Sequence, residues 1–515
     1  MYEIWSYVLA AAAVIAAAAA WWGWRIVWLK PKRMEKHLKC QGYVGNPYKV
    51  LFGDLKDFSA LNKHARSTPI SFSDDILPRA APFLHKSINT FGKKSIMWFG
   101  HMPRVHLTDT ELVKEVLSKN FKYVKTKINP LVKLLLTGLL RYDLDQWAKH
   151  RKIINPAFHM DKLKLMLPAF HVSCLEMINE LQKATTNEST KEVDVWPYLQ
   201  TLTADVISRT AFGSSYEEGR KIFQLLKIQA ELVTKAVSTL YIPGWRFIPT
   251  KRNMRMKKIA KQIDNLLINL INKRVNALKA GESNNEDLLN ILLESNFRED
   301  KCGKMMGMTI KEVVDECKVF YFAGQETTAA LLVWTMVLLA HHQEWQHRAR
   351  EEVFQVFGKD NKPNFDGLNR LKIVTMILNE VLRLYPPVVQ FSRTINEDMK
   401  LGESLHLQAG TLIALPIILL HHDKEVWGDD AKEFKPERFA EGISKATKGQ
   451  FSYLPFSWGP RVCIGQNFAL LEAKMAVAMI LQHFSFELSP LYTHAPWPTI
   501  ILQPQFGAPL IMHQI

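Results

Sequence analysis

The sequence has few cysteines, and none stand at the paired spacings that bind zinc. The 515-residue chain contains an odd number of them, scattered along its length: Cys40, Cys174, Cys302, Cys317 and Cys463. This pattern argues against a disulfide-stabilised secreted scaffold and favours a reducing compartment. No internal repeat is visible, and no basic tract is interleaved with aromatic residues, so nucleic-acid binding is not indicated.

Charged residues are almost absent from the first 24 positions. Glu3 is the only one, and the apolar segment Ile4–Trp24 ends in a cluster of tryptophans. About 20 apolar residues suffice to cross a bilayer, and tryptophan favours its interface. Because basic residues follow the segment, the positive-inside rule keeps the rest of the chain in the cytosol. We therefore predict a membrane anchor over residues 1–29. A cleaved signal peptide, the alternative, would have its basic residues first.

The whole chain carries a formal charge of +16, and its basic surplus begins directly after the apolar segment. Residues 30–50 are interpreted as a basic linker with a hinge at Gly42–Pro47, and residues 51–515 are long enough to bury a sizeable core. With no nucleic-acid motif present, an anionic membrane or an acidic protein is the expected partner of this charge.

One glycine-bracketed loop, Phe456–Gly465, carries Cys463 and leads into a helix-like run. Glycine lets a backbone approach a flat cofactor closely, and N–H groups at a helix start stabilise a thiolate. Arg461 would supply a cation for an acidic edge of such a cofactor. The loop therefore has the chemistry of a thiolate ligand. The alternative is a small buried cysteine in a turn.

A long helix is predicted from Thr309 to about Leu339, and Thr309 opens a capping box with Glu312. Its middle, Ala323–Thr328, interrupts the apolar pattern with a glycine, a glutamate and two threonines. A buried helix rarely accepts this combination without a use for it. A helix-packing notch with an exposed glutamate would have the same sequence.

Two residue pairs at helical spacing stand elsewhere. Trp147 and Arg151 are four residues apart and share a helix face, as a functional pair or simply as an aromatic packed beside a cation. Glu380 and Arg383 lie three apart on a helix that Pro386-Pro387 ends. Beyond that helix, the segment 405–415 is predicted to form a small hairpin.

The pattern Phe-x-x-Gly-x-Arg-x-Cys-x-Gly resembles the haem-thiolate loop of the cytochrome P-450 monooxygenases. The other motifs follow in that family's order, and the resemblance covers essentially the whole chain. At finer grain, three segments resemble the plant group that includes secologanin synthase and the triterpenoid oxidases of saponin pathways: Phe320–Thr328, Trp458–Cys463 and Gln505–Ala508. The resemblance implies a mainly α fold with a small β-rich lobe and an N-terminal transmembrane helix.

The resemblance also implies roles for single residues. Cys463 would be the axial ligand of a haem b iron. Gly324 would let the helix open near the haem, Thr327 would donate a hydrogen bond toward bound oxygen, and Glu326 would relay protons. The other haem contacts, including those to the propionates, would come from Phe456, Trp147, Arg151, Arg393 and Arg461. A purely structural group would support the cysteine loop: Glu380, Arg383 and Arg438.

The implied reaction is NADPH-dependent oxidation of a C–H position in a hydrophobic plant metabolite or hormone of terpenoid origin (triterpenoid, iridoid or gibberellin-type). Electrons would arrive from an NADPH–cytochrome reductase at the endoplasmic reticulum membrane, and O2 would be the oxidant. Substrate contacts are expected near Leu131–Leu140, Ala323, Val388–Phe391 and Ile501.

Two other functions stay open at this point. One is a haem-thiolate isomerase or dehydratase, against which the presence of both Glu326 and Thr327 argues. The other is a non-catalytic membrane haem protein, which would not bind carbon monoxide if its iron were six-coordinate. The sequence also carries a reporter of topology, because Asn187-Glu188-Ser189 is a glycosylation sequon in the predicted loop Ala184–Glu192. In a cytosolic domain Asn187 stays unmodified.

Overall fold

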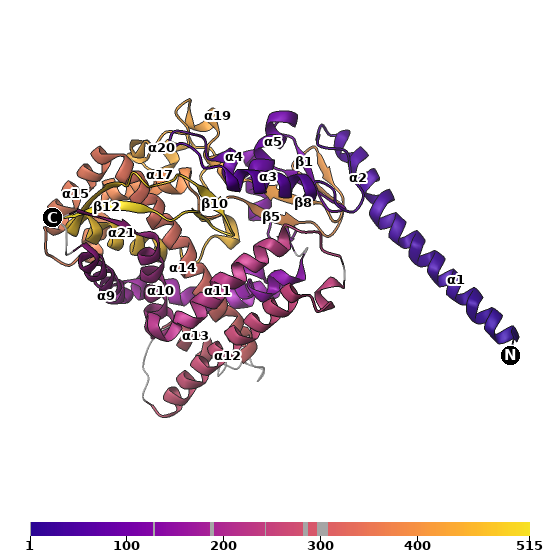
Figure 1. Ribbon diagram of the computed structural model, residues 1–515, viewed down its shortest axis with the longest axis horizontal. Helices are drawn as coiled ribbons and strands as arrows, with labels where there is room; N and C mark the ends of the chain where they lie inside the picture. The colour runs from indigo at the N-terminus through magenta and orange to yellow at the C-terminus, as the bar shows by residue number, and fades with distance from the viewer. Residues whose placement is uncertain (1, 127–128, 186–189, 243, 282–286, 296–306) are drawn as a thin grey trace.

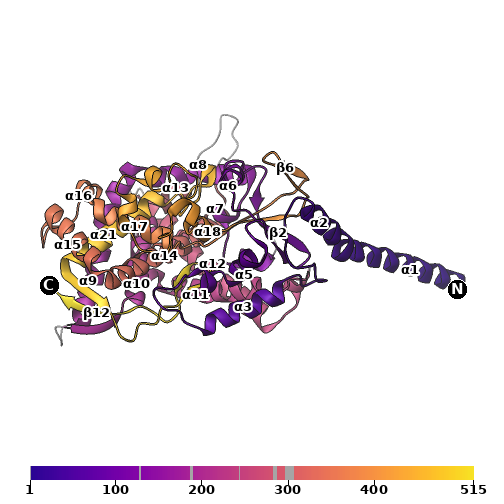
Figure 2. The same cartoon turned by 90° about the horizontal axis from the view of Figure 1, so that it is seen from above.

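A computed structural model describes residues 2–126, 129–185, 190–242, 244–281, 287–295 and 307–515. The body is mostly helical with small sheets, and one helix, α1 (Tyr2–Trp24), projects away from it (Figures 1 and 2). The mainly α fold with a β-rich lobe is therefore confirmed.

The projecting helix continues through a π-helical turn, Arg25–Leu29, into α2 (Lys30–Lys39). The run Ile4–Lys39 is apolar and long enough to span a bilayer, and its most apolar stretch is not buried. In contrast, α2 buries Met34 and Leu38 in a cluster with strands of the larger sheet. Residues 30–39 are thus helical and packed on the body. The division into anchor, linker and haem domain at residues 29 and 50 stays a prediction.

The helical layer is organised around α14 (Ile310–His341). Its predicted capping box is confirmed: Glu312 N–H donates to Thr309 Oγ1 at 3.2 Å, and Thr309 N–H donates to the Glu312 carboxylate at 2.9 Å. This helix is also apolar enough to span a membrane, but it is mostly buried and serves as the central core helix. The longer helices packed against it are α10 (Trp196–Phe212), α11 (Tyr216–Val237), α12 (Lys251–Lys279), α15 (Gln343–Phe357), α17 (Lys372–Leu384) and α21 (Gln466–His483).

The remaining helices cover this centre and its edges. They are α3 (Leu55–Ser67), α4 (Leu77–Ala80), α5 (Pro82–Phe91), α6 (Thr110–Ser118), α7 (Gly138–Arg141), α8 (Leu144–Ile154), α9 (Met160–Thr185), α13 (Leu288–Glu294), α16 (Phe365–Arg370), α18 (Ile417–His421), α19 (Lys424–Trp427) and α20 (Ile443–Ala446).

The larger sheet has the strand order β1-β2-β8-β5-β3. Its strands are β1 (Ile96–Phe99), β2 (Met102–His106), β3 (Val124–Lys125), β5 (Phe391–Thr394) and β8 (Leu412–Leu415). The predicted hairpin over 405–415 is wrong, because β7 (Leu405–Leu407) pairs with β6 (Met399–Leu401) instead. All four residues of β8 are buried, and a central strand of this kind needs the partners that β2 and β5 provide on both sides.

Two smaller sheets lie near the C-terminus. One has the order β4-β12-β9, from β4 (Thr190–Asp194), β12 (Pro509–Gln514) and β9 (Phe484–Leu488), and the other pairs β10 (Pro496–Pro498) with β11 (Leu502–Pro504). The predicted loop Ala184–Glu192 is corrected at both ends, since α9 runs to Thr185 and β4 begins at Thr190. The sequon Asn187 lies outside the described residues.

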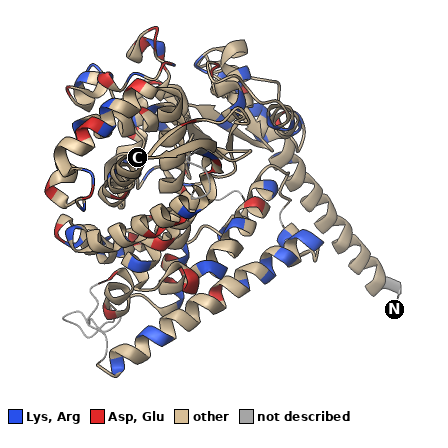
Figure 3. Ribbon diagram, turned by 60° about the vertical axis from the view of Figure 1, so that its left-hand side comes forward, with Lys and Arg blue, Asp and Glu red and all other residues tan. Residues whose placement is uncertain are grey.

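The basic surplus is not spread evenly. The 29-residue helix α12 is rich in lysine and arginine, and Asp264 is its only acidic residue, so basic residues gather toward its two ends, at 251–261 and 273–279 (Figure 3).

Candidate active site

The cysteine loop is closed by its own backbone. Cys463 N–H donates to the Phe456 carbonyl at 2.9 Å, directly before α21 begins. Gly459 has a φ of +71°, and a Cβ at this position would lie 2.6 Å from the Leu117 carbonyl at the end of α6. Only glycine fits there, so the close approach to α6 fixes the loop.

The Cys463 side chain keeps accessible surface, although protein atoms surround it closely. Burial raises its pKa, while the N–H of Gly465 and the positive charge of Arg151 act in the opposite direction. Arg151 also donates through Nη1 to the Val462 carbonyl at 2.8 Å. The loop therefore carries built-in donors for a thiolate, which is the form that ligates a metal.

A group of buried cations surrounds one carboxylate near this loop. Arg461 donates through Nη2 to Asp143 Oδ1 at 2.9 Å, and both side chains are almost fully buried. Its guanidinium lies 4.6 Å from the centre of the Trp147 ring. Burial, and after it the positive charge of Arg393, lowers the pKa of Lys125 well below its ordinary value. Burial also lowers the pKa of Arg393, to about 10. Positive charge is thus concentrated where the low dielectric makes it costly.

These cations have spare hydrogen-bonding capacity. Arg461 Nε and Nη1 and Arg393 Nε are buried without a hydrogen-bond partner among the described residues. Lys125, Arg393 and Arg461 all lie near the single carboxylate of Asp143, and Arg141 also interacts with it. A haem b presents two acidic propionates, so the free donors of this basic group fit that cofactor.

The middle of α14 borders open space on one face. Ala323, Gly324 and Thr327 are partly exposed, although their neighbours along the helix are buried. Thr327 Oγ1 donates to the Ala323 carbonyl at 2.7 Å. A Cβ on Gly324 would lie 2.8 Å from Ile207 Cγ1 of α10, so this glycine is needed for helix packing. Its predicted part in opening the helix stays a prediction.

Glu326 lies on the same helix but is buried, and it borders a small cavity. Burial raises its pKa to about 7, and the positive charge of Lys227 opposes this rise. The cavity, of about 30 Å³, is also lined by Phe322 and Ile501. A carboxyl group that titrates near neutrality can both accept and release a proton, which is the property that a relay needs.

The predicted structural group is tightly bonded. Arg383 makes two hydrogen bonds of 2.7 Å to Glu380, and both side chains are fully buried. Arg438 Nε lies 3.4 Å from Glu380 Oε1 and joins the pair. The remaining Arg383 donors bind backbone carbonyls, among them His421 O at 2.9 Å.

A chain of bonds connects this group to the cysteine loop. Leu454 N–H donates to His421 Nε2 at 2.8 Å, so the proton on the ring lies at Nδ1 and is donated to the Arg383 carbonyl at 3.2 Å. Burial lowers the pKa of His421 to about 3, which keeps the ring neutral. The segment that enters the loop is thereby held to α17.

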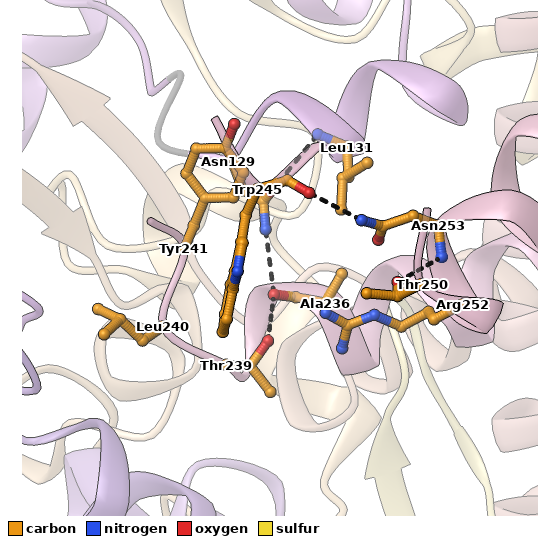
Figure 4. A pocket seen from close by; sticks show the side chains of 10 residues that line it. All are labelled: Asn129, Leu131, Ala236, Thr239, Leu240, Tyr241, Trp245, Thr250, Arg252 and Asn253. Atoms are coloured by element: carbon orange, nitrogen blue, oxygen red, sulfur yellow. Dashed lines mark hydrogen bonds between the residues drawn. The ribbon is translucent and has the colours of Figure 1, made fainter. Parts of the chain in front are cut away.

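The expected substrate segment Leu131–Leu140 lies partly at a cavity of about 80 Å³ (Figure 4). Leu131 and Trp245 line it, and Asn129 bridges its walls by donating through Nδ2 to the Ala236 carbonyl at 3.0 Å. The other expected positions are distributed: Ile501 lies at the Glu326 cavity, Ala323 is on α14, and 388–391 are partly exposed next to β5. Their contacts with a substrate remain predictions.

Sequence reasoning missed Lys125 and Asp143. Neither belongs to a recognisable motif, and Lys125 reaches the cluster only because β3 pairs with β5, where it stands opposite Arg393. Asp143 directly precedes the helix that carries Trp147, and an aspartate at this position indicates only where a helix begins.

A cysteine beside hydrogen-bond donors, a group of cations with spare donors and a partly exposed face of the central helix together fit a haem-thiolate protein. The family model described as cytochrome P-450 matches residues 81–505. Over 96% of its length the chain is 58% identical to cytochrome P-450 CYP72A219 of Panax ginseng, of which the match covers 96%. It is 52% identical to secologanin synthase 2 of Catharanthus roseus, covering 96% of this chain and 95% of that protein.

The chain belongs to the cytochrome P-450 family, as a monooxygenase of the plant CYP72 type. A solved structure, retinoic acid-bound cyanobacterial CYP120A1, superimposes with a TM-score of 0.72 over 85% of this chain and 96% of that one. At 23% identity this match shows the shared fold alone. Haem b is the cofactor of this family, and NADPH is its usual electron source through a reductase.

Proposed function

We propose that this protein is a reductase-coupled monooxygenase of the endoplasmic reticulum membrane that hydroxylates or further oxidises a C–H position of a hydrophobic, terpenoid-derived plant metabolite. The observation that carries the substrate class is the 52% identity to secologanin synthase 2 along nearly the whole chain. The exposed apolar helix α1 favours the membrane location.

Cys463 would hold the haem iron, and Lys125, Arg393 and Arg461 would receive the two propionates. When bound, the haem supplies the activation of O2 and the insertion of one oxygen atom. Arg151 holds the ligand loop through the Val462 carbonyl, and Trp147 covers one face of Arg461. The chain's own part at this site is therefore to fix the ligand and to neutralise the cofactor's acidic edge.

Proton delivery is assigned to α14. Glu326 would hold a proton at its buried carboxyl and release it toward the partly exposed face of the helix. Thr327 would donate its hydroxyl proton there, which requires it to give up the bond to the Ala323 carbonyl. Because its pKa is about 7, the Glu326 carboxylate can take up a new proton at the cytosolic pH.

The proposal is tested by coexpressing the full chain with a plant reductase in yeast membranes. Iridoids, triterpenes and gibberellin-type diterpenes are then screened for an NADPH-dependent gain of one oxygen atom. The Cys463→Ser variant serves as the control. Conversion of a terpenoid by the parent alone is expected. Conversion without NADPH would favour a reductase-independent isomerase, and conversion of non-terpenoids only would overturn the substrate class.

A further inference from the structure

A second cleft, of about 450 Å³, lies where α14 and α17 end. The segment before α4, the junction of α14 with α15 and the segment before Pro436 form its other walls. None of the residues assigned to haem or to proton delivery lines it. Its size falls within the range of small-molecule sites, roughly 300–1,000 Å³.

Aromatic rings stand on two sides of this cleft. Phe72 stacks on His341 with ring centres 4.1 Å apart, and Phe434 lies 4.8 Å from His342. Burial lowers the pKa of both histidines, so their rings are uncharged at neutral pH and do not repel a cation. The faces of uncharged aromatic rings attract cations.

The charge around the cleft is negative. The lining lysines are already paired, Lys432 with Asp75 at 2.7 Å and Lys435 with Asp430 at 3.0 Å. Three lining carboxylates have no ion pair among the residues that the structure describes: Asp74, Glu344 and Glu437. In addition, α14 and α17 direct their C-terminal ends here, where the helix dipole is negative, whereas α15 begins here and carries Glu344 in its first turn.

One buried group in the wall requires a hydrogen-bond donor. His422 is 9% exposed, and its Nε2 lies 3.0 Å from the Leu384 carbonyl, which places the proton on Nε2. Nδ1 is then an acceptor, and it has no partner among the described residues. Burial lowers the pKa of this ring to about 4, so the acceptor persists at neutral pH. Buried acceptors are normally satisfied.

We propose that this cleft binds a small organic cation that carries N–H donors and an apolar body. The uncharged rings would hold the body and the charge, the unpaired carboxylates would attract the cation, and His422 Nδ1 would accept one N–H. This inference does not depend on which metabolite is oxidised at the haem.

The test uses the full-length, haem-loaded protein in detergent and the probe benzylguanidine. Its guanidinium stays charged and cannot ligate the iron. Neutral benzylurea is the matched control compound. By calorimetry we expect benzylguanidine to bind at least about fivefold more tightly than benzylurea, with affinity falling as salt rises and with no change in the haem Soret band.

Two variants locate the site. Glu344→Gln removes an exposed rim charge, and Phe72→Leu removes a ring face while keeping an apolar side chain. Each should weaken benzylguanidine binding by about threefold or more. Glu351→Gln, on the same helix but outside the cleft, should leave it unchanged. Since Glu344 is exposed, its variant decides the matter if Phe72→Leu fails to fold.

Three results would overturn the inference. The first is equal binding of benzylguanidine and benzylurea. The second is binding that Glu344→Gln leaves unaltered or that Glu351→Gln weakens as much. The third is binding accompanied by a Soret change, which would place the probe in the haem pocket.

Discussion

Lys125 and Arg393 stand directly opposite each other on the antiparallel strands β3 and β5. Like charges in this position destabilise a sheet, and burial increases the cost. The arrangement is understandable if an acidic cofactor edge neutralises the pair, as two haem propionates would. The two positive charges therefore destabilise the haem-free protein and stabilise the haem-bound protein.

Replacing Lys125 by methionine separates these two effects. We expect the haem-free variant to be as stable as the parent or more so, because a half-buried cation that stands opposite the like charge of Arg393 is removed. We expect the loaded variant to lose haem to apomyoglobin about tenfold faster, since a charge-assisted hydrogen bond is lost. Lys122→Met, three residues earlier at an exposed position, is the control and should match the parent in both measurements.

Glu326 should make stability depend on pH. Its folded pKa, about 7, lies above its ordinary value of 4.5, so burial of the uncharged carboxyl is favoured at low pH. That contribution is fully present below pH 4.5 and is lost once the pH has risen through about 7. The difference corresponds to about 3 kcal/mol. Unfolding of the parent and of Glu326→Gln, compared from pH 4.5 to 8, should therefore diverge in that window. A difference that stays constant with pH would contradict the assignment.

Thr327→Ala tests the proton path. The variant should still bind substrate, but its product formed per NADPH should fall to about half of the parent's value or less, with peroxide taking up the electrons. Thr335→Ala is the matched control, because Thr335 also donates to the carbonyl four residues back at 2.7 Å but is fully buried. Equal coupling in Thr327→Ala and Thr335→Ala would show that the hydroxyl has no special part.

Arg383→Leu tests the structural group. Leaving Glu380 buried without its partner should cost about 3–5 kcal/mol, and haem incorporation should drop sharply. Arg220 and Glu217 form an ion pair at the same sequence spacing and 2.7 Å, but on the surface. Arg220→Leu should therefore change stability by less than about 1 kcal/mol. Similar losses in both variants, measured by thermal haem release, would remove the distinction between buried and exposed pairs.

Much of the helical layer was predictable because its signals are local. The capping box at Thr309 and the apolar periodicity before Pro386 each lie within one helix. The cysteine loop was predictable for the same reason, since its residues stand at fixed offsets. Short strands carry no such signal: three residues at Leu405–Leu407 do not reveal which strand they pair with.

The cation cluster shows what sequence patterns cannot supply. Lys125 and Arg393 are distant in the chain and meet only through strand pairing, and Asp143 joins them from the start of α8. Gly324 shows a different limit, because its use against Ile207 depends on how closely α10 approaches. Both features depend on tertiary packing, which a local sequence pattern does not encode.

The central claim is that Cys463 is the thiolate ligand of the haem, and the carbon monoxide spectrum of the reduced protein tests it most directly. The parent should show the red-shifted Soret band that thiolate ligation gives in this family. Cys463→His should retain haem poorly or lack that band. An unchanged red-shifted band in Cys463→His would place the ligand elsewhere and contradict the account.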